Sequence, residues 1–396
     1  MAVPIFAAGR TWVAVALSLS AAGGLAGCAQ PAPDAAAQSG PAVSAAARGL
    51  ALPAGSSRAG QLSAVAAVSA RSAWAVGVTN RRRPLIERWD GTTWSRVASP
   101  DPGPAGGFVP LQGVSALSTR DAWAVGEVAV SGHTLIVHWN GTAWRRVPSP
   151  SPSTGGNVLN AVAAGSASSA WAVGYAGSSS ILATTLIEHW NGQVWTHVPS
   201  PAPQPGCGGC QFPGDRLAGA AATSAANAWA VGSSGHGALI EHWDGTRWRW
   251  VRAGDAALPG AGVAGVAATS ADDAWAVGTA DGNTLTEHWN GTTWTRVPSP
   301  SPASADVGNQ LTSVAAVSPS SAWAAGYSGN QTLILHWDGR TWTQMPAASR
   351  GDEPEFLGVT VTSGSAWAVG LDGSDDTLIA RWNGKTWTRQ PDRQPR

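Results

Sequence analysis

Short runs of small apolar residues alternate with polar, turn-forming stretches along most of this chain. Residues 62–68 form one such run, and an Ala-Trp-Ala-Val-Gly run around Trp74 follows it. Later in a unit, segments such as 284–289 and 294–298 mix β-branched and aromatic residues with polar ones. Runs of roughly four to eight residues of this kind, bounded by Gly, Pro, Asn or Asp, are typical of β-strands. This pattern therefore predicts four short strands in each unit.

Three tryptophans recur in every unit at nearly fixed offsets, and the chain contains seven units. The first tryptophan of each unit lies in the Ala-Trp-Ala run: Trp74, Trp123, Trp171, Trp229, Trp275, Trp323 and Trp367. The other two flank a Trp-(Asp/Asn)-Gly turn: Trp89/Trp94, Trp139/Trp144, Trp190/Trp195, Trp243/Trp248, Trp289/Trp294, Trp337/Trp342 and Trp382/Trp387. Successive units begin 44 to 58 residues apart, which is typical of β-propeller blades. The sequence therefore predicts an all-β fold, a seven-bladed β-propeller of four-stranded antiparallel blades.

Tryptophan is the main large apolar residue, because the chain has 23 Trp but only 4 Phe, 2 Tyr and 2 Met. A closed ring needs large side chains between its blades, and a buried tryptophan covers roughly 150–250 Å². We therefore expect the repeat tryptophans to form the core between the blades.

The Trp-(Asp/Asn)-Gly turn between the third and fourth strands resembles a known motif. Asp-Gly and Asn-Gly tolerate positive φ and are typical of hairpins. The stretch 89–94, Trp-Asp-Gly-Thr-Thr-Trp, resembles the Asp-box of BNR-type propellers in its Gly, Thr and last Trp. It departs from that motif because the Asp is shifted by one position and the leading Ser is missing. The resemblance implies the fold and no particular activity.

Residues 1–27 look like an export signal. Arg10 precedes the apolar stretch 11–22, which is too short to span a bilayer. The sequence Leu-Ala-Gly-Cys that ends at Cys28 resembles the bacterial lipobox. That resemblance implies that Cys28 receives a diacylglycerol, and two acyl chains anchor a protein stably. The alternative is an ordinary cleaved signal peptide with a chance cysteine, which predicts a secreted protein.

Residues 28–60 contain the lipidated cysteine and a stretch rich in Ala, Pro, Ser and Gly, which predicts a flexible tether. Residues 61–396 are the predicted propeller. Its blades are expected at about 61–100, 110–150, 157–201, 216–252, 262–302, 310–346 and 355–390. The whole organisation resembles secreted, Trp-rich propeller lipoproteins of actinobacteria. We therefore expect an extracytoplasmic, lipid-anchored monomer.

Loop lengths separate the two faces of the predicted ring. The interval from the first to the second Trp ranges from 14 to 19 residues, and that from the third Trp to the next unit from 15 to 22. In a four-stranded meander these two connections share one face, and variable loops on a repeated scaffold usually carry binding. The candidate binding residues on this face are Arg81, Arg82, Arg83, His133, Tyr175, His236, Asp281, Tyr327 and Asp372.

Histidine recurs directly before the second Trp, as His138, His189, His242, His288 and His336, with Arg88 and Arg381 in the other two units. Glutamate recurs one position earlier, as Glu87, Glu188, Glu241 and Glu287. Because a residue repeated around a ring is usually structural, we interpret both positions as structural. A cross-blade Glu–His or Glu–Arg pair is the hypothesis for their role.

Cys207 and Cys210 lie in the longest connection between units. In an exported protein this spacing favours a local disulfide, and a stiffened loop binds at lower entropic cost. The alternative is a zinc site formed by both thiolates and His236, which lacks a fourth ligand. Residues 372–376 do not fit the EF-hand pattern, so we interpret them as a solvated turn.

No catalytic constellation is recognisable in the sequence. The formal net charge is zero, which gives no electrostatic footprint for nucleic acid. Sialidases share the Asp-box and use an arginine triad with a Tyr–Glu pair, but here residues 81–83 cluster in one loop and Tyr175 and Tyr327 are the two tyrosines. No nucleophile elbow, phosphate loop or paired-carboxylate site is present. We expect no enzyme activity, cofactor or metal.

The leading hypothesis is a membrane-tethered, non-enzymatic propeller that binds an extracytoplasmic protein or glycan. A lectin with Trp-lined sugar sites at the blade junctions is the alternative, and it requires exposed repeat tryptophans. A BNR-type glycan-degrading enzyme is a third hypothesis, which requires two close acidic side chains near the ring axis.

Overall fold

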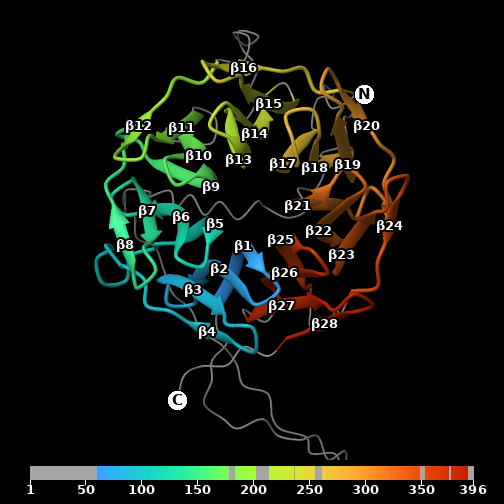
Figure 1. Cartoon of the computed structure of the whole chain (residues 1–396), viewed down its shortest axis with the longest axis horizontal. Coiled ribbons are helices and arrows are strands. Elements are labelled where there is room, and N and C mark those ends of the chain that lie inside the picture. The colour runs from blue at the N-terminus through green and yellow to red at the C-terminus, as the bar shows by residue number, and fades with distance from the viewer. Residues whose placement is uncertain are drawn as a thin grey trace, which may run out of the picture. The chain divides into compact units, whose positions relative to one another are not determined.

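Seven four-stranded antiparallel sheets make up the part of the molecule that the structure describes. The structure is a computed structural model and describes residues 60–177, 183–201, 214–235, 237–254, 261–347, 353–373 and 376–390. Each sheet consists of four strands that are consecutive in the chain. Figure 1 shows the sheets around a common axis, with the first strand of each innermost and the fourth outermost. The predicted seven-bladed β-propeller is confirmed.

The first four blades contain sixteen strands. Blade one has β1 (Gly60–Ser69), β2 (Ser72–Thr79), β3 (Pro84–Trp89) and β4 (Trp94–Arg96). Blade two has β5 (Leu111–Ser118), β6 (Asp121–Val128), β7 (His133–Trp139) and β8 (Trp144–Val147). Blade three has β9 (Asn157–Ser166), β10 (Ser169–Ala176), β11 (Thr184–Trp190) and β12 (Trp195–His197). Blade four has β13 (Arg216–Ser224), β14 (Asn227–Ser234), β15 (Gly237–Trp243) and β16 (Trp248–Trp250).

The remaining three blades repeat this order. Blade five has β17 (Gly262–Ala268), β18 (Ala274–Ala280), β19 (Asn283–Trp289) and β20 (Trp294–Arg296). Blade six has β21 (Asn309–Ser318), β22 (Ser321–Ser328), β23 (Gln331–Trp337) and β24 (Trp342–Gln344). Blade seven has β25 (Glu355–Thr362), β26 (Ser365–Leu371), β27 (Thr377–Trp382) and β28 (Trp387–Arg389). The outermost strand of each blade has only three or four residues, and such short edges limit pairing with other chains.

The turn between the third and fourth strands is closed by its Asp or Asn side chain. In blade one, Asp90 Oδ1 accepts hydrogen bonds from the backbone N–H groups of Thr92 and Thr93, both at 2.8 Å. Within this turn only Gly91 has a positive φ, of 101°. Glycine therefore supplies the left-handed conformation, while the preceding side chain supplies a hydrogen-bond acceptor. The bond from the Thr93 backbone, followed by those from Thr92, lowers the pKa of Asp90 to about 2.

We expect Asn140→Ala to destabilise the equivalent turn of blade two. Asn140 Oδ1 accepts hydrogen bonds from the N–H groups of Thr142 and Ala143 at 3.1 and 3.0 Å. Alanine removes this acceptor, which should lower the free energy of unfolding by about 0.5–1.5 kcal/mol. Urea denaturation measures the loss, and Asn140→Asp is the control because it keeps an acceptor oxygen. Equal losses in the two variants would contradict this account of the turn.

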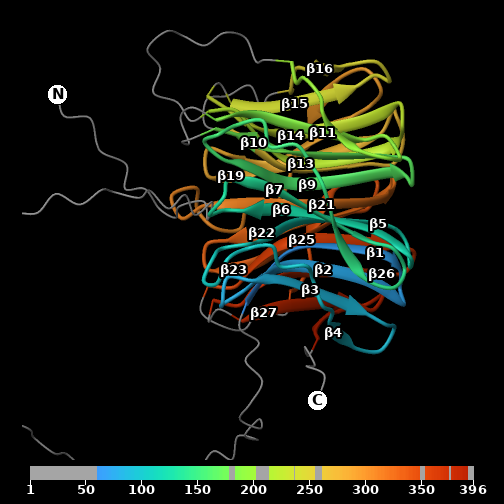
Figure 2. The same ribbon diagram turned by 90° about the vertical axis from the view of Figure 1, so that its left-hand side faces the viewer.

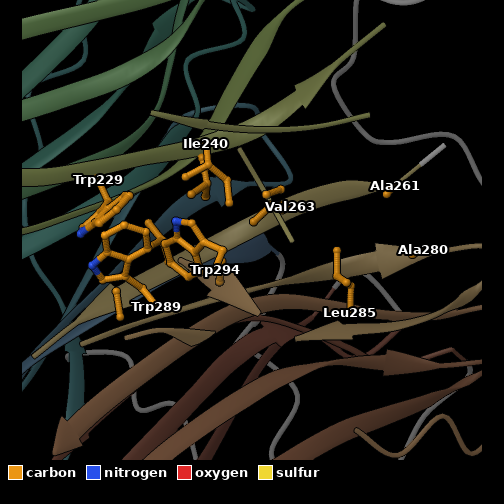
Figure 3. Packing of buried hydrophobic residues seen from close by; sticks show 13 residues of the cluster. Trp229, Ile240, Ala261, Val263, Ala280, Leu285, Trp289 and Trp294 are labelled. Carbon is orange, nitrogen blue, oxygen red and sulfur yellow. The ribbon is translucent and has the colours of Figure 1, made fainter. Parts of the chain in front are cut away.

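The core lies between neighbouring blades, and the repeat tryptophans pack there as predicted, together with Val, Leu, Ile and Ala side chains. At the junction of blades four and five, the ring centroid of Trp229 lies 5.1 Å from those of Trp289 and Trp294 (Figure 3). The planes of Trp229 and Trp294 meet at 84°, the edge-to-face arrangement that aromatic quadrupoles favour. The first and third tryptophans are at most 5% exposed in all seven blades.

The ring closes through the same packing that joins its internal blades. Trp367 of blade seven lies 4.8 Å from Trp89 and 5.2 Å from Trp94 of blade one. The backbone N–H of Ala67 donates to Thr360 Oγ1 across this junction at 3.2 Å, and blades two and three share an equivalent bond. Since each described sheet consists of consecutive strands, the first and last blades meet by face packing and exchange no strand.

Small residues allow seven inner strands to meet around one axis. A Cβ built on Gly113 would lie 2.8 Å from Ala161 Cα of the next blade, and one on Gly358 would lie 3.0 Å from Ala64 Cα. Contacts this short leave no space for a side chain in a close-packed interior. This crowding explains why the first strand of each unit is rich in small residues.

The repeated histidine is structural, but its partner differs from the cross-blade glutamate that we hypothesised. The His138 ring centroid lies 4.1 Å from that of Trp123 in the same blade. Its Nε2 lies 2.8 Å from Asp121 Oδ1. Since Trp123 pairs with His138 in the ladder, Asp121 lies on the same sheet face, two residues earlier. In blade one, Arg88 takes the histidine's place over Trp74, at 5.2 Å.

The repeated glutamates are buried and differ in their partners. Glu87 lies 3.7 Å from Arg96 within blade one, and Glu241 accepts a hydrogen bond from Ser200 of the preceding blade at 2.7 Å. Neither carboxyl oxygen of Glu188 has a hydrogen-bond partner among the described residues. Burial raises the pKa of Glu188 to about 8.

Candidate functional site

One face of the ring, which we call the variable face, carries the connections of variable length. These connections join the second strand to the third within a blade, and the fourth strand to the first strand of the next blade. Figure 2 shows the strands running between this face and the opposite one. The opposite face carries tighter turns, such as residues 70–71 between β1 and β2.

One repeat position next to the variable face changes from blade to blade. It lies four residues after the first tryptophan, near the end of the second strand. The residues there are Val78, Glu127, Tyr175, Ser233, Thr279, Tyr327 and Leu371. The preceding four positions read Trp-Ala-Val-Gly in six blades and Trp-Ala-Ala-Gly in the other, because they fill the core. A varying position at the edge of a uniform scaffold is where specificity for a ligand is expected.

Three side chains from consecutive blades form a cluster at this level. Glu127 and Tyr175 lie near the ends of β6 and β10, and Arg216 is the first residue of β13. The guanidinium carbon of Arg216 lies 4.3 Å from the centre of the Tyr175 ring, which is a cation–π distance. All three residues are partly exposed. Within the described ranges, neither the Glu127 carboxyl nor the Arg216 guanidinium has a hydrogen-bond or ion-pair partner.

Burial controls the protonation of this cluster. It raises the pKa of Glu127 to about 7, so near neutral pH the carboxyl exists as both the neutral acid and the carboxylate. The pKa of Tyr175 is raised by burial first and by the charge of Glu127 second, while Arg216 acts in the opposite direction. Tyr175 therefore stays a neutral phenol, suited to stacking and hydrogen bonding rather than to nucleophilic attack.

The second tyrosine occupies the same repeat position but has a different neighbour. Tyr327 donates its hydroxyl to Gln310 Oε1 at 2.8 Å, and the two residues face each other in the register of β21 and β22. This hydrogen bond satisfies the phenol within blade six. The charged cluster around Tyr175 thus differs in chemistry from the neutral pair at Tyr327.

Two of the predicted binding-face residues, Arg83 and Asp372, form ion pairs with other segments of the chain. Arg83 forms an ion pair with Asp101, with 3.1 Å between Nε and Oδ2, and donates to the carbonyl oxygen of Pro104 at 3.1 Å. Asp372 is only 6% exposed and accepts a hydrogen bond from Arg389 Nη2 at 2.6 Å. The interpretation of this turn as solvated is therefore wrong at Asp372, because its carboxylate is buried against Arg389.

Other predicted residues of the binding face are exposed. Arg81, Arg82, His133 and Asp281 all lie in or beside loops between second and third strands. His133 also borders a surface hollow of about 470 Å³ together with Arg146. These residues belong to the variable face, and within the described ranges none of them has a hydrogen bond, ion pair or ring contact with a residue of the charged cluster.

The cluster contains two residues that the sequence reasoning missed, Glu127 and Arg216. A signal was available, since Glu127 is the one charged residue at a position that is apolar, hydroxyl-bearing or aromatic in the other blades. The proposed lipidation, disulfide and zinc ligands stay predictions, because they lie outside the described residues: Cys28, Cys207, Cys210 and His236.

The described site combines a carboxyl, a phenol and a guanidinium. In the part of the chain that the structure describes, no group of three or more His, Cys, Asp or Glu residues is placed to hold a metal ion. No helix in that part is long and apolar enough to cross a membrane. The cluster offers one carboxyl beside a tyrosine and an arginine, whereas the glycan-degrading hypothesis requires two close acidic side chains.

Comparisons with known proteins support the fold. No family model and no curated protein matches the sequence. The chain is similar to the structure of YCF48 bound to D1 peptide, with a TM-score of 0.54 and 16% identity, over 82% of this chain and 92% of that chain. A six-bladed, fucose-recognising lectin of Aleuria aurantia gives a TM-score of 0.50 and 13% identity, over 84% and 95% of the two chains.

A puromycin hydrolase is also similar, with a TM-score of 0.54 and 10% identity. The match covers 84% of this chain but only 53% of the hydrolase, so the chain spans about half the length of that enzyme. At these identities the similarities show that the chain has a propeller fold, and they assign no activity.

Proposed function

We propose that this protein is a membrane-tethered, extracytoplasmic propeller that captures a segment of another protein on its variable face. The observation that carries the proposal is the cluster of Glu127, Tyr175 and Arg216, whose carboxyl and guanidinium groups have no partner in the described ranges. A polypeptide segment presents complementary groups: carbonyl oxygens accept from a guanidinium, and N–H groups donate to a carboxylate.

The fold and the aromatic content of the face support a protein ligand. Tyr175 supplies a rigid contact surface at a low cost in side-chain entropy. Its ring is already oriented by Arg216 at 4.3 Å, so less ordering is needed when a ligand binds. The solved structure of YCF48 contains D1 peptide, which supports peptide capture by a propeller at the level of the fold.

Tryptophan burial favours a protein ligand over the lectin alternative. Sugar stacking requires an open indole face, but the first and third repeat tryptophans are at most 5% exposed. The second tryptophan packs against the preceding blade, as Trp243 does against Trp171 with 4.7 Å between ring centroids. The second tryptophans are buried in three blades and partly exposed in the other four. Most of the tryptophan surface that a junction lectin would need is therefore used in packing.

Binding to immobilised panels of short peptides and of glycans, including fucosides, tests the proposal with the full-length protein in detergent. We expect wild-type protein to bind a subset of the peptides. Tyr175→Ala should weaken that binding by about tenfold, since truncated aromatic anchors commonly cost this much. Arg120→Ala is the matched control, because Arg120 is exposed in a turn of the opposite face. Binding to glycans alone, or peptide binding unaffected by Tyr175→Ala, would overturn the proposal.

The membrane tether is a separate part of the proposal and rests on the lipobox-like sequence before Cys28. We expect Cys28→Ser to release the protein from the membranes of a bacterial host or to leave the precursor uncleaved, because serine cannot accept the thioether-linked lipid. Fractionation and the size of the mature chain measure this. Cys207→Ser is the control, since it leaves the lipobox intact. Normal processing and membrane recovery of Cys28→Ser would remove the lipoprotein interpretation.

A further inference from the structure

Arg216 differs from the other partly buried arginines of the described chain. Three of these form ion pairs with carboxylates, namely Arg83, Arg96 and Arg389. Two others, Arg88 and Arg381, lie over the first tryptophan of their own blades at a repeated structural position. Arg216 has neither a carboxylate partner nor a tryptophan, and its one ring contact is with Tyr175. Its charge is therefore partly desolvated and uncompensated, which is costly unless an anion is supplied.

The contact with Tyr175 holds the guanidinium of Arg216 in place. At 4.3 Å from the ring centre, the guanidinium plane is available for stacking on the phenol, which limits its rotation. The Nε atom is buried and has no hydrogen-bond partner in the described ranges. A planar fork of N–H donors held in this way matches the two oxygens of a carboxylate.

We propose that Arg216, held against Tyr175, binds a carboxylate group of the captured protein segment. The inference rests on the proposed function and adds the chemistry that the ligand must carry. A carboxylate fits better than a phosphate, because the site holds one cation, Arg216, and one carboxyl, Glu127, which acts on the same tyrosine. A single negative charge is balanced by one guanidinium, whereas a dianion meets stronger repulsion from the Glu127 carboxylate. The carboxylate comes from the C-terminus of the segment or from an acidic side chain.

Three matched peptide sets distinguish these sources. One set has free C-terminal carboxylates, the second is amidated and contains an internal Glu, and the third is amidated and has no acidic residue. We expect full-length wild-type protein to bind one of the acidic sets about tenfold more tightly than the third, as a charge-assisted bidentate pair allows. Arg216→Met keeps an apolar contact with Tyr175 and should abolish this preference. Arg247→Met is the control, because Arg247 is exposed on the opposite face of the same blade.

A second measurement does not depend on finding a peptide. In wild-type protein with ¹⁵N-labelled arginine, N-acetylglycine should shift the Arg216 Nε–H resonance, which Arg216→Lys identifies. N-acetylglycinamide, which lacks the carboxylate, should leave the resonance in place. An equal response to both probes would overturn the inference.

The two measurements separate the inference from the function on which it rests. Peptide binding with the same affinity for all three sets contradicts carboxylate recognition and leaves peptide capture standing. A carboxylate-specific shift at Arg216 without binding of any peptide contradicts peptide capture and leaves the carboxylate site standing.

Discussion

Trp229→Ala is expected to lower the free energy of unfolding by about 3–5 kcal/mol, the usual cost of emptying a large core site. Trp229 is fully buried and packs against Trp289 and Trp294 of the next blade. It also stacks on His242 of its own blade with 4.1 Å between ring centroids. Alanine therefore removes contacts on both sides of the junction and leaves a cavity that the rigid strands cannot close. Urea denaturation followed by circular dichroism measures the effect.

Trp250→Ala is the matched control for this prediction. Trp250 lies on the outer strand β16 of the same blade and is 51% exposed. Removing an exposed indole should change stability by no more than about 0.5 kcal/mol. Similar losses for Trp229→Ala and Trp250→Ala would mean that the blade junctions do not stabilise the ring.

Glu188→Gln is expected to weaken the dependence of stability on pH. Burial raises the folded-state pKa of Glu188 from 4.5 to about 8. Between these values the folded protein keeps a proton that the unfolded chain releases, so stability falls as pH rises through this window. For a fully buried carboxyl the decrease is on the order of 3 kcal/mol. Glutamine has no proton to lose, so the variant should be more stable than wild type at about pH 8 and show a shallower slope.

The measurement is urea denaturation of both proteins between about pH 5 and about pH 8. Asp306→Asn is the control, because Asp306 is exposed in the connection between blades five and six. It should leave the slope unchanged. Identical slopes for wild type and Glu188→Gln would contradict the raised pKa of Glu188. They would show that a hydrogen-bond donor or solvent stabilises its carboxylate and lowers that pKa.

The architecture was predictable because each blade is a local unit with a repeated sequence. The spacing of Trp229, Trp243 and Trp248 within one unit predicts strand two, strand three and the turn to strand four, and the structure confirms this order. Invariant five-residue spacing between the second and third tryptophans also predicted which face carries tight turns. The strand order and the turns depend on contacts within a blade or between neighbouring blades of similar sequence. Because these contacts recur in every blade, the residues that make them recur in the sequence.

The partners of polar side chains were less predictable. The hypothesis of a cross-blade pair between the repeated glutamate and histidine is wrong for His138, which pairs with Asp121 of its own blade. Asp372 was interpreted as solvated, whereas it is buried against Arg389. In both cases the partner is 17 residues away in the chain, and only strand pairing brings it within hydrogen-bond distance.

By itself, the sequence determined the number of blades, the strands in each blade and the tryptophan core, because these follow from local hydrophobic patterns repeated along the chain. Only the tertiary structure decided which of the non-repeated residues lie close together. Glu127 and Tyr175 are 48 residues apart, and Tyr175 and Arg216 are 41 apart. Glu127 and Tyr175 occupy a repeat position whose residue type varies between blades, so the repeat pattern shows the position but not which side chains meet there. The packing of consecutive blades brings the ends of the second strands β6 and β10 near the start of the first strand β13, and this geometry assembles the cluster.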